Sequence, residues 1–494
     1  LPTRAWELAV GGLVALTVAQ WRRLPTSTAA ILGCAGLAII LFASSELGTS
    51  TPYPGTAALL PVLGTALVIG AGCAAPSGGA GRALSLPPMR AVGRVSYSWY
   101  LWHWPVLLFA APLVGHSLGL VGRLTAVAVS GGLAVLTLRF IENPCRSAIS
   151  LRRSDGRSLA LGGAATAVAA CTGAALFLAV PIPSGHGPSA PRLTVTELPT
   201  SINHDVSNAV VQQAYSQVQA AVAVSAALRG VPSNLDPPLA NASGDRAAIL
   251  VNGCLLSFDQ VRQGECATGD TASATTVALV GDSHATMWNP ALQQVANRRQ
   301  WRLETMGKEA CPLMNLPINY PRLRREYTEC EQWRSQILAR LEVEHPQLVV
   351  LSMSRSYGTA YGFRSYDPAW IESLKLLVTK LRAVGSKVLV LGPIPSPPPM
   401  VPTCLSAHLD DATACSPERS TAVSDSGIAA EHTATESSGG DYADLTELFC
   451  TTDRCPAIVG NTLVYRDDNH LTSQYALELA PVIAALEGRA LASH

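Results

Sequence analysis

Charged side chains are scarce in this sequence: Asp, Glu, Lys and Arg make up only 14% of its 494 residues, against about 25% in ordinary soluble domains. Residues 1–182 contain no lysine and only four acidic residues beside 12 arginines, so their net charge is +8. Residues 183–494 hold the other 23 basic and 31 acidic residues and carry −8. This division excludes a single soluble globule, and a hydrophobic content of 48% excludes disorder as the dominant state. No nucleic-acid partner is expected, because the second part is acidic.

Long apolar runs fill the first part. Each covers about 17–23 residues, enough for a helix to cross a hydrocarbon core of ~30 Å, and their interiors carry almost no charge. They predict a multi-pass α-helical membrane domain over residues 1–180, with six spans near residues 5–21, 29–46, 56–75, 95–115, 119–140 and 158–180.

The arginines of the predicted loops indicate how these spans are oriented. Arg22 and Arg23 follow the first span, and the loops after the third and fifth spans are also rich in arginine, unlike those after the second and fourth. The positive-inside rule places the arginine-rich loops in the cytoplasm. With six spans, both chain ends then lie outside. We therefore expect a protein of the plasma membrane, in contact with the lipid bilayer, whose residues 183–494 are extracytoplasmic.

The cysteines agree with an exported second part. Eight of the 12 lie after residue 250, and an even number in an exported domain predicts disulfides. Eight cysteines allow 105 pairings, of which the pairing of sequence neighbours is the simplest. No Cys/His spacing resembles a zinc site, so no metal is predicted. The neighbouring pairs are 254–266, 311–330, 404–415 and 450–455.

The second part begins with a predicted linker, residues 181–250, containing one helix at 207–229. From about residue 275, short β-rich runs alternate with helical segments, which predicts an α/β domain over residues 251–494 with a parallel sheet and covering helices. Residues 405–445 are polar and predict a surface excursion with some helix. The predicted strands are 275–280, 301–306, 347–353 and 387–393, and the predicted helices are 292–300, 330–344, 372–385 and 474–491.

Ser283 follows the first predicted strand directly, in the tight turn Gly281-Asp282-Ser283-His284. The carboxyl end of a parallel strand is where α/β folds place reacting groups. The N-terminus of the next helix would favour developing negative charge there. These features predict an activated nucleophile, although an ordinary serine N-cap has the same local sequence. His284 is interpreted as part of the turn.

Asp467 and His470 form a second pattern before the last predicted helix. An aspartate three residues before a histidine can accept the proton on imidazole Nδ1, which leaves Nε2 free as a general base toward a serine. Asp467 has the better spacing and Asp468 is the alternative partner. A solvated acidic turn with an incidental histidine would look the same.

The two patterns together resemble the SGNH (GDSL-like) hydrolases, with strand–GDSH early and DxxH late. In the first part, RVSYSWYLWHWP (94–105), PTRAWELAVG (2–11) and FIENPCR (140–146) resemble segments of the acyltransferase-3 membrane family. The joined arrangement is similar to bacterial O-acetyltransferases of the O-antigen and peptidoglycan type. Because that family usually has about ten spans, and this sequence opens with Leu1, we expect that an N-terminal part is missing.

The resemblance implies a membrane-bound O-acyltransferase. It would move an acyl group, commonly acetyl, from a cytoplasmic acetyl-CoA or another acyl-CoA to hydroxyls of an envelope polysaccharide, peptidoglycan or glycolipid, without a bound cofactor. Ser283 would carry the acyl group, His470 would move the proton and Asp467 would hold His470.

The resemblance is weaker at the oxyanion hole. The N–H of Ser283 is expected to serve, and Gly307 is the candidate for the family's glycine. The strand at 347–353 is followed by Ser354-Arg355 rather than by G-x-N-D, so Arg355 either takes part or holds the loop. His103, in YLWHWP, matches the membrane-family segment and has either a catalytic role or a packing role.

Two other functions remain open. The same Ser–His–Asp set would act as a membrane-tethered carbohydrate esterase or deacetylase if water replaced the sugar. A non-catalytic envelope-binding protein is the third reading, and the intact Ser283, Asp467 and His470 argue against it.

Overall fold

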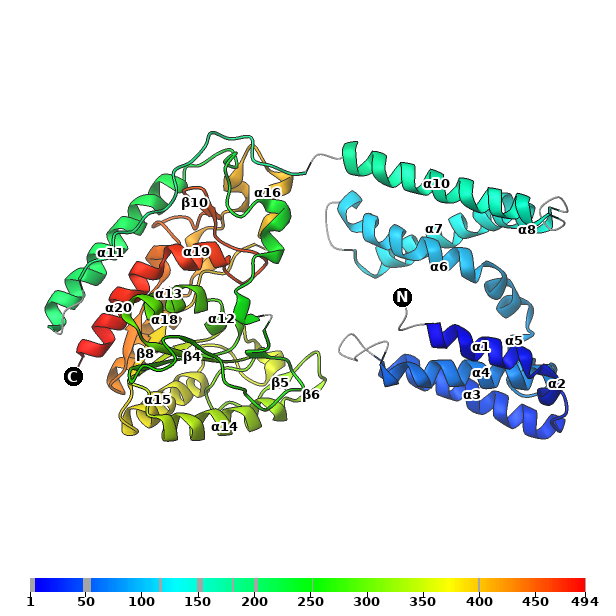
Figure 1. The fold of residues 1–494 in the computed structure, drawn as a ribbon, viewed down its shortest axis with the longest axis horizontal. Helices are drawn as coiled ribbons and strands as arrows, with labels where there is room; N and C mark the ends of the chain where they lie inside the picture. The colour runs from blue at the N-terminus through cyan, green and yellow to red at the C-terminus, as the bar shows by residue number, and fades with distance from the viewer. Residues whose placement is uncertain are drawn as a thin grey trace. The chain divides into compact units, whose positions relative to one another are not determined.

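The computed structural model describes residues 5–47, 55–114, 118–148, 154–179, 182–199, 203–250, 252–398 and 400–493. The chain divides into two compact units, Leu1–Val180 and Pro181–His494. Each unit is described by itself, and Figure 1 labels its elements.

The first unit is built of helices, and α3 packs on α4 while α6 packs on α7. Small residues let the first pair approach closely: a Cβ on Gly36 would lie 2.6 Å from the Gly64 carbonyl oxygen, a packing mode common between membrane helices. The helices are α1 (Ala5–Leu16), α2 (Val18–Trp21), α3 (Thr26–Glu46), α4 (Leu59–Ala74), α5 (Ala80–Leu84), α6 (Pro87–Val114), α7 (Leu120–Thr137), α8 (Asn143–Ser147) and α10 (Asp155–Ala179).

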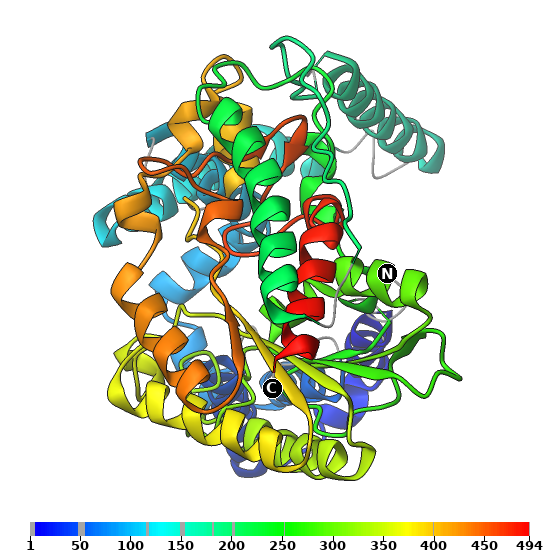
Figure 2. The ribbon, with the colours of Figure 1, turned by 90° about the vertical axis from the view of Figure 1, so that its left-hand side faces the viewer.

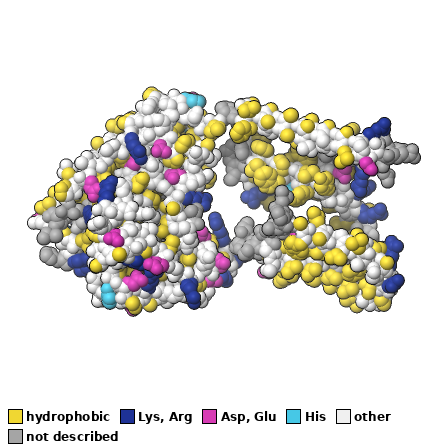
Figure 3. All heavy atoms as spheres, viewed as in Figure 1, with side chains coloured by type: hydrophobic (Ala, Val, Ile, Leu, Met, Phe, Trp, Pro, Cys, Tyr) yellow, Lys and Arg dark blue, Asp and Glu magenta, His cyan; other side chains and the backbone are white. Residues whose placement is uncertain are grey.

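Four helices among the described residues are long and apolar enough to cross a membrane: Thr26–Glu46, Thr56–Ala74, Leu120–Ser147 and Asp155–Ala179. Figure 3 shows hydrophobic atoms covering these helices, with most Lys and Arg atoms of this unit gathered at one end. The other two predicted spans also form helices, but α1 is short and α6 contains many aromatic and polar residues. A membrane unit is confirmed, while the number six stays a prediction. Arg152 and Arg153, in the loop predicted after the fifth span, lie outside the described residues.

The second unit contains the predicted parallel sheet, in the order β1-β4-β3-β7-β8-β9, with β2 antiparallel to β4. The parallel order around β3 confirms the α/β class and creates a switch point at β3 and β7, where such folds place their sites. The strands are β1 (Leu255–Leu256), β2 (Ala267–Gly269), β3 (Thr276–Gly281), β4 (Arg302–Lys308), β7 (Leu348–Ser352), β8 (Lys387–Leu391) and β9 (Asp441–Ala443); the pairs β5 (Asn319–Tyr320) with β6 (Arg325–Glu326), and β10 (Ile458–Val459) with β11 (Thr462–Leu463), are separate.

Helices cover both faces of this sheet (Figures 1 and 2). Val277 and Leu279 of β3 pack in the core under α11, α13 and α20, whereas Ala278 and Val280 pack in the core under α14 and α15. This period-two alternation, with apolar residues on both faces, is typical of a buried parallel strand. The helices are α11 (His204–Ser225), α12 (Ser283–Thr286), α13 (Asn289–Arg299), α14 (Thr328–Glu344), α15 (Pro368–Ala383), α16 (Val401–Ala407), α17 (Arg419–Ala422), α18 (Asp425–Ser437), α19 (Ser473–Glu478) and α20 (Ala480–Ala492).

The segment predicted as a linker, residues 181–250, is largely part of the second unit. Helix α11 packs against α20 and buries Val211, Val218 and Val222 in the core of the sheet's first face. The hydroxyl of Tyr215 donates to the Asp444 carbonyl oxygen at 3.0 Å. The apolar face of this helix therefore packs on the domain. Exposing such a row of valines to water would be unfavourable.

The segment predicted as a surface excursion, residues 405–445, contains the expected helix, as α17 and α18. It also contains the sheet strand β9, which was not predicted and which pairs parallel with β8. The strand has only three residues and begins with Asp441, so it shows no readable alternation in the sequence. Asp441 is tolerated there because Arg489 of α20 forms an ion pair with it at 2.5 Å.

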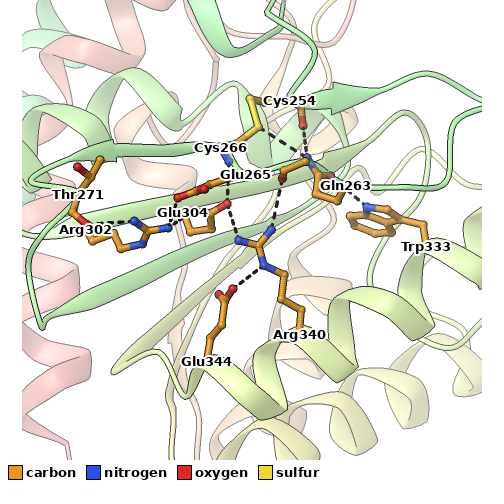
Figure 4. A network of polar contacts seen from close by, with 11 residues as sticks. Cys254, Gln263, Glu265, Cys266, Thr271, Arg302, Glu304, Trp333, Arg340 and Glu344 are labelled. Carbon is orange, nitrogen blue, oxygen red and sulfur yellow. Dashed lines mark hydrogen bonds and ion pairs between the residues drawn. A yellow bond between two sulfur atoms is a disulfide. The ribbon is translucent and has the colours of Figure 1, made fainter.

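Disulfides join the neighbouring cysteines, as the simplest pairing predicted: Cys254–Cys266, Cys311–Cys330, Cys404–Cys415 and Cys450–Cys455. The first bond closes a loop beside a network of charged groups, shown in Figure 4. There the fully buried Glu304 accepts hydrogen bonds from the Cys266 N–H at 2.8 Å and from Arg302 at 3.2 Å, and pairs with Arg340 at 2.9 Å. Buried carboxylates need such partners, and this one ties the edge of the sheet to α14.

Glu487 of α20 is buried without a full set of partners, and it makes the stability of this unit depend on pH. Its Oε2 meets no hydrogen-bond donor among the described residues, and burial raises the pKa of Glu487 from 4.5 to about 8 despite the nearby Arg299. The folded state holds this proton more tightly than the unfolded state does. The contribution of Glu487 to stability is therefore fully present below pH 4.5 and is lost as the pH rises through 8.

We expect Glu487→Gln to remove most of that loss. One pKa unit corresponds to about 1.36 kcal/mol. The melting temperature of the variant should therefore be several degrees above that of the parent at pH 8.5, and the two melting temperatures should be nearly equal at pH 5. Thermal unfolding of the full chain in detergent at both pH values measures this. Glu372→Gln on the exposed side of α15 is the control, and an equal shift at both pH values would contradict the assignment.

Candidate functional site

Ser283 stands at the N-terminus of α12, directly after β3. A side chain at Gly281 would place Cβ 1.9 Å from the Ser352 carbonyl oxygen on β7, so the chain can turn there only with glycine. The Asp282 side chain then caps α12 by accepting the His284 N–H at 2.8 Å. The sharp turn leaves the Ser283 side chain half-buried at the carboxyl edge of the sheet.

Asp282 also joins this turn to the loop after β7. It is fully buried, and it accepts the Ser354 N–H at 2.9 Å and the Tyr357 hydroxyl at 3.3 Å. Burial raises the pKa of Asp282, and these hydrogen bonds partly oppose that rise. The aspartate of the GDSH motif therefore holds two loops of the site together.

His470 connects Ser283 to Asp467, as the sequence predicted. The Ser283 Oγ lies 2.8 Å from His470 Nε2, and His470 Nδ1 lies 2.9 Å from Asp467 Oδ2. Because Nδ1 faces a carboxylate, the proton belongs on Nδ1, and Nε2 is left to accept the serine proton. The structure thus brings together three residues that come from opposite ends of the domain sequence.

Asp467, and not Asp468, is the partner of His470. Asp467 accepts the backbone N–H groups of Asn469 at 3.0 Å and His470 at 2.7 Å, which aims its carboxylate at the ring. Burial alone would raise its pKa, but the bonds from His470 and the nearby Arg466 lower it to about 2. Asp468 is exposed and has no hydrogen bond with His470 among the described residues.

Gly307 does not provide an oxyanion donor, which corrects the sequence prediction. It lies inside β4, paired with Gly281 on one side and Leu255 on the other. The N–H groups of Thr305 and Glu309 point toward the β1 and β2 side, and alternate residues of a strand point alike. The N–H of Gly307 therefore faces β1, away from Ser283.

Ala310, just after β4, is a feature that sequence reasoning missed. It lines the cavity beside Ser283, has φ of +48°, and its N–H meets no acceptor among the described residues. A left-handed conformation is costly for alanine. The sequence gives no sign of this position, because the N–H lacks an acceptor as a result of the backbone conformation and not of the residue type.

Arg355 holds the loop instead of facing Ser283. Its buried guanidinium forms an ion pair with Glu431 of α18 at 2.9 Å and donates to the carbonyl oxygens of Met353 and Leu391. Glu431 also accepts from Trp370 at 2.7 Å. Of the two roles predicted for Arg355, the structural one is observed.

His103 bonds within its own helix, and His284 is not one of the three residues in contact at Ser283. His103 Nδ1 lies 2.6 Å from the Tyr100 carbonyl oxygen on α6, so that nitrogen is used within the helix. His284 is buried, its Nε2 meets no partner among the described residues, and burial lowers its pKa well below the usual value. A neutral His284 ring 5.3 Å from the His470 ring adds no charge to the site.

Cys404, His408 and Cys415 lie close enough to suggest a metal site. The two cysteines form a disulfide, and a metal needs thiolates. Only His408 keeps a free ligand atom there.

A cavity of about 470 Å³ opens onto Ser283 and His470, a size suited to a small ligand. Its lining includes the aromatic rings of Phe258, Tyr320 and Tyr361, and arginines as well. The relay, the N–H groups of Ser283 and Ala310, and a cavity in front of them suit attack of a serine on an acyl carbonyl.

The chain is similar to one described family and to several known proteins. Residues 253–485 match the family described as "SGNH domain (fused to AT3 domains)". The chain is 31% identical over 155 residues to the peptidoglycan O-acetyltransferase OatA of Listeria monocytogenes, covering 29% of this chain and 24% of OatA. It is 30% identical over 179 residues to BcsY of Komagataeibacter xylinus, whose name describes a membrane-bound transacylase, covering 36% of this chain and 43% of BcsY.

The chain thus spans less than half the length of either curated relative. Among solved structures, the periplasmic domain of a lipopolysaccharide acetyltransferase from Salmonella ser. Paratyphi A matches with a TM-score of 0.35 and 18% identity, covering 47% of this chain and 85% of that one.

Proposed function

We propose, from the premise that residues 253–485 belong to the SGNH domains fused to acyltransferase-3 domains, that this chain is a membrane-bound O-acyltransferase acting on a cell-envelope glycan. The observation that carries the proposal is the relay from Ser283 Oγ through His470 to Asp467, with both contacts within 2.9 Å. The names of both curated relatives support transfer of an acyl group rather than another reaction of a serine enzyme.

The transfer takes two steps that use the same groups. Ser283 Oγ attacks the acyl carbonyl carbon while His470 Nε2 takes its proton, and His470 then gives that proton to the leaving group as the acyl-serine forms. A sugar hydroxyl attacks the acyl-serine, His470 takes the hydroxyl proton, and it returns the proton to Ser283. The oxyanion is stabilised by the N–H groups of Ser283 and Ala310.

The donor and its route belong to the same proposal. The apolar helices of the first unit lie in the plasma membrane, with residues 183–494 on the extracytoplasmic side. An acyl-CoA, commonly acetyl-CoA, supplies the acyl group from the cytoplasm. The chain's partners are then this donor, the bilayer, and an envelope polysaccharide, peptidoglycan or glycolipid acceptor.

A carbohydrate esterase is the second candidate, favoured by one observation. The His470 side chain remains 16% exposed, so water can reach the relay. Hydrolysis follows if water attacks the acyl-serine before a sugar does.

The partition of the acyl group tests the proposal. The full chain in detergent would receive an activated acetyl ester with increasing concentrations of a soluble envelope glycan, and free acetate and acetyl-glycan would be measured by mass spectrometry. A transferase forms acetyl-glycan at the expense of acetate as the acceptor increases. Acetate release that the acceptor leaves unchanged would instead identify an esterase.

A further inference from the structure

The cavity in front of Ser283 has an aromatic wall that suits a sugar ring. The ring centroids of Phe258 and Tyr320 lie 4.7 Å apart, and those of Tyr320 and Tyr361 lie 5.8 Å apart, so the three rings are neighbours along the cavity. The hydroxyls of Tyr320 and Tyr361 donate to no residue in the part of the chain that the structure describes. An aromatic face with free hydroxyls at its edge can pack against a ring and bond its hydroxyls.

Arg466 gives the same cavity a buried positive charge whose one ion pair, with Asp467, is long. Its side chain is only 8% exposed, and its guanidinium makes no hydrogen bond to any described residue. The nearest carboxylate oxygen, on Asp467, is 3.6 Å away and already serves His470. A guanidinium has five donors, and leaving them unmatched in a buried site is unfavourable.

Two further arginines, Arg246 and Arg322, line the exposed part of the cavity. Four carboxylates, those of Asp282, Glu309, Asp467 and Asp468, line the cavity as well. Asp282 and Asp467 are each occupied by three hydrogen bonds from the site itself. Asp467 pairs with Arg466, whereas Arg246 and Arg322 form no ion pair with any described residue. Burial raises the pKa of Glu309, which favours its neutral form.

We infer that the acceptor is an acidic sugar, whose ring packs on Tyr320 and Tyr361 and whose carboxylate or phosphate binds Arg466 with help from Arg246 and Arg322. This inference rests on the proposed function and names its substrate class. Guanidinium groups bind both anions through paired, charge-assisted hydrogen bonds. A hydroxyl of the same sugar unit then meets the acyl group on Ser283.

The test compares acceptors that differ only in charge. Transfer by the full chain in detergent would be measured with oligogalacturonate and its primary-amide form, and with a phosphorylated oligosaccharide and its dephosphorylated form. We expect kcat/KM to be at least about tenfold higher for one of the charged acceptors than for its neutral partner, and the pair that shows this identifies the anion.

Arg246→Gln combined with Arg322→Gln should lower that ratio about tenfold, mainly through KM, without touching the relay. Arg324→Gln, which removes an exposed arginine in the same loop as Arg322 but outside the cavity, should keep the parent ratio. Equal transfer to charged and neutral acceptors, or a ratio that survives the double substitution, would overturn the inference. No Ser283-dependent transfer to any acceptor would refute the proposed function itself.

Discussion

Ser283→Ala should lower both acetyl transfer and acetate release by about 10³–10⁶-fold, because no acyl-enzyme can form without the hydroxyl. Ser283 Oγ lies 2.8 Å from His470 Nε2, and the proposed mechanism therefore makes this serine the nucleophile. The same variant should also lose covalent labelling by a fluorophosphonate, which peptide mass spectrometry would locate on Ser283 in the parent.

Ser335→Ala is the matched control for that experiment. Ser335 is exposed on α14, where its hydroxyl donates to the Glu331 carbonyl oxygen, and its loss should leave turnover as in the parent. Turnover above a tenth of the parent value in Ser283→Ala would mean that the chain transfers acyl groups by another route, or that it is an envelope-binding protein with background hydrolysis.

Asp467→Asn should lower kcat about 10⁴-fold, whereas Asp468→Asn should lower it by about threefold at most. An amide at 467 favours the wrong imidazole tautomer, so that Nε2 can no longer accept the serine proton. The two variants have the same change of charge, one residue apart, and only Asp467 contacts His470. Steady-state rates with an activated acetyl ester measure both.

The pKa of Asp467 adds a pH test to this pair. Since it is lowered from 3.8 to about 2, the carboxylate stays charged throughout pH 4–9, and its contribution to stability is lost only as the pH falls through 2. The parent should therefore show no loss of activity from Asp467 above pH 4.

Comparable losses in the two asparagine variants would assign the effect to charge near the site and not to the relay.

The sequence predicted the three residues that the structure brings into contact, but not the groups around them. Ser283 was readable because a tight GDSH turn follows an apolar run, and Asp467 with His470 because both lie on one short turn. Gly307 was a wrong choice because residue type does not reveal which way an N–H points within a strand. Arg355 was ambiguous because its partner, Glu431, is 76 residues away.

By itself, the sequence determined the division into a membrane unit and an α/β unit, most strands of the sheet, and which serine, histidine and aspartate would lie in contact. These depend on local runs, periodicity and turn residues, which act over a few positions. Only the tertiary structure decided that α11 and β9 belong to the domain, that the Ala310 N–H meets no acceptor among the described residues, and that Arg466 and three aromatic rings line one cavity. Those features arise from strand order and burial, which bring distant residues together and determine which of their polar groups remain unpaired.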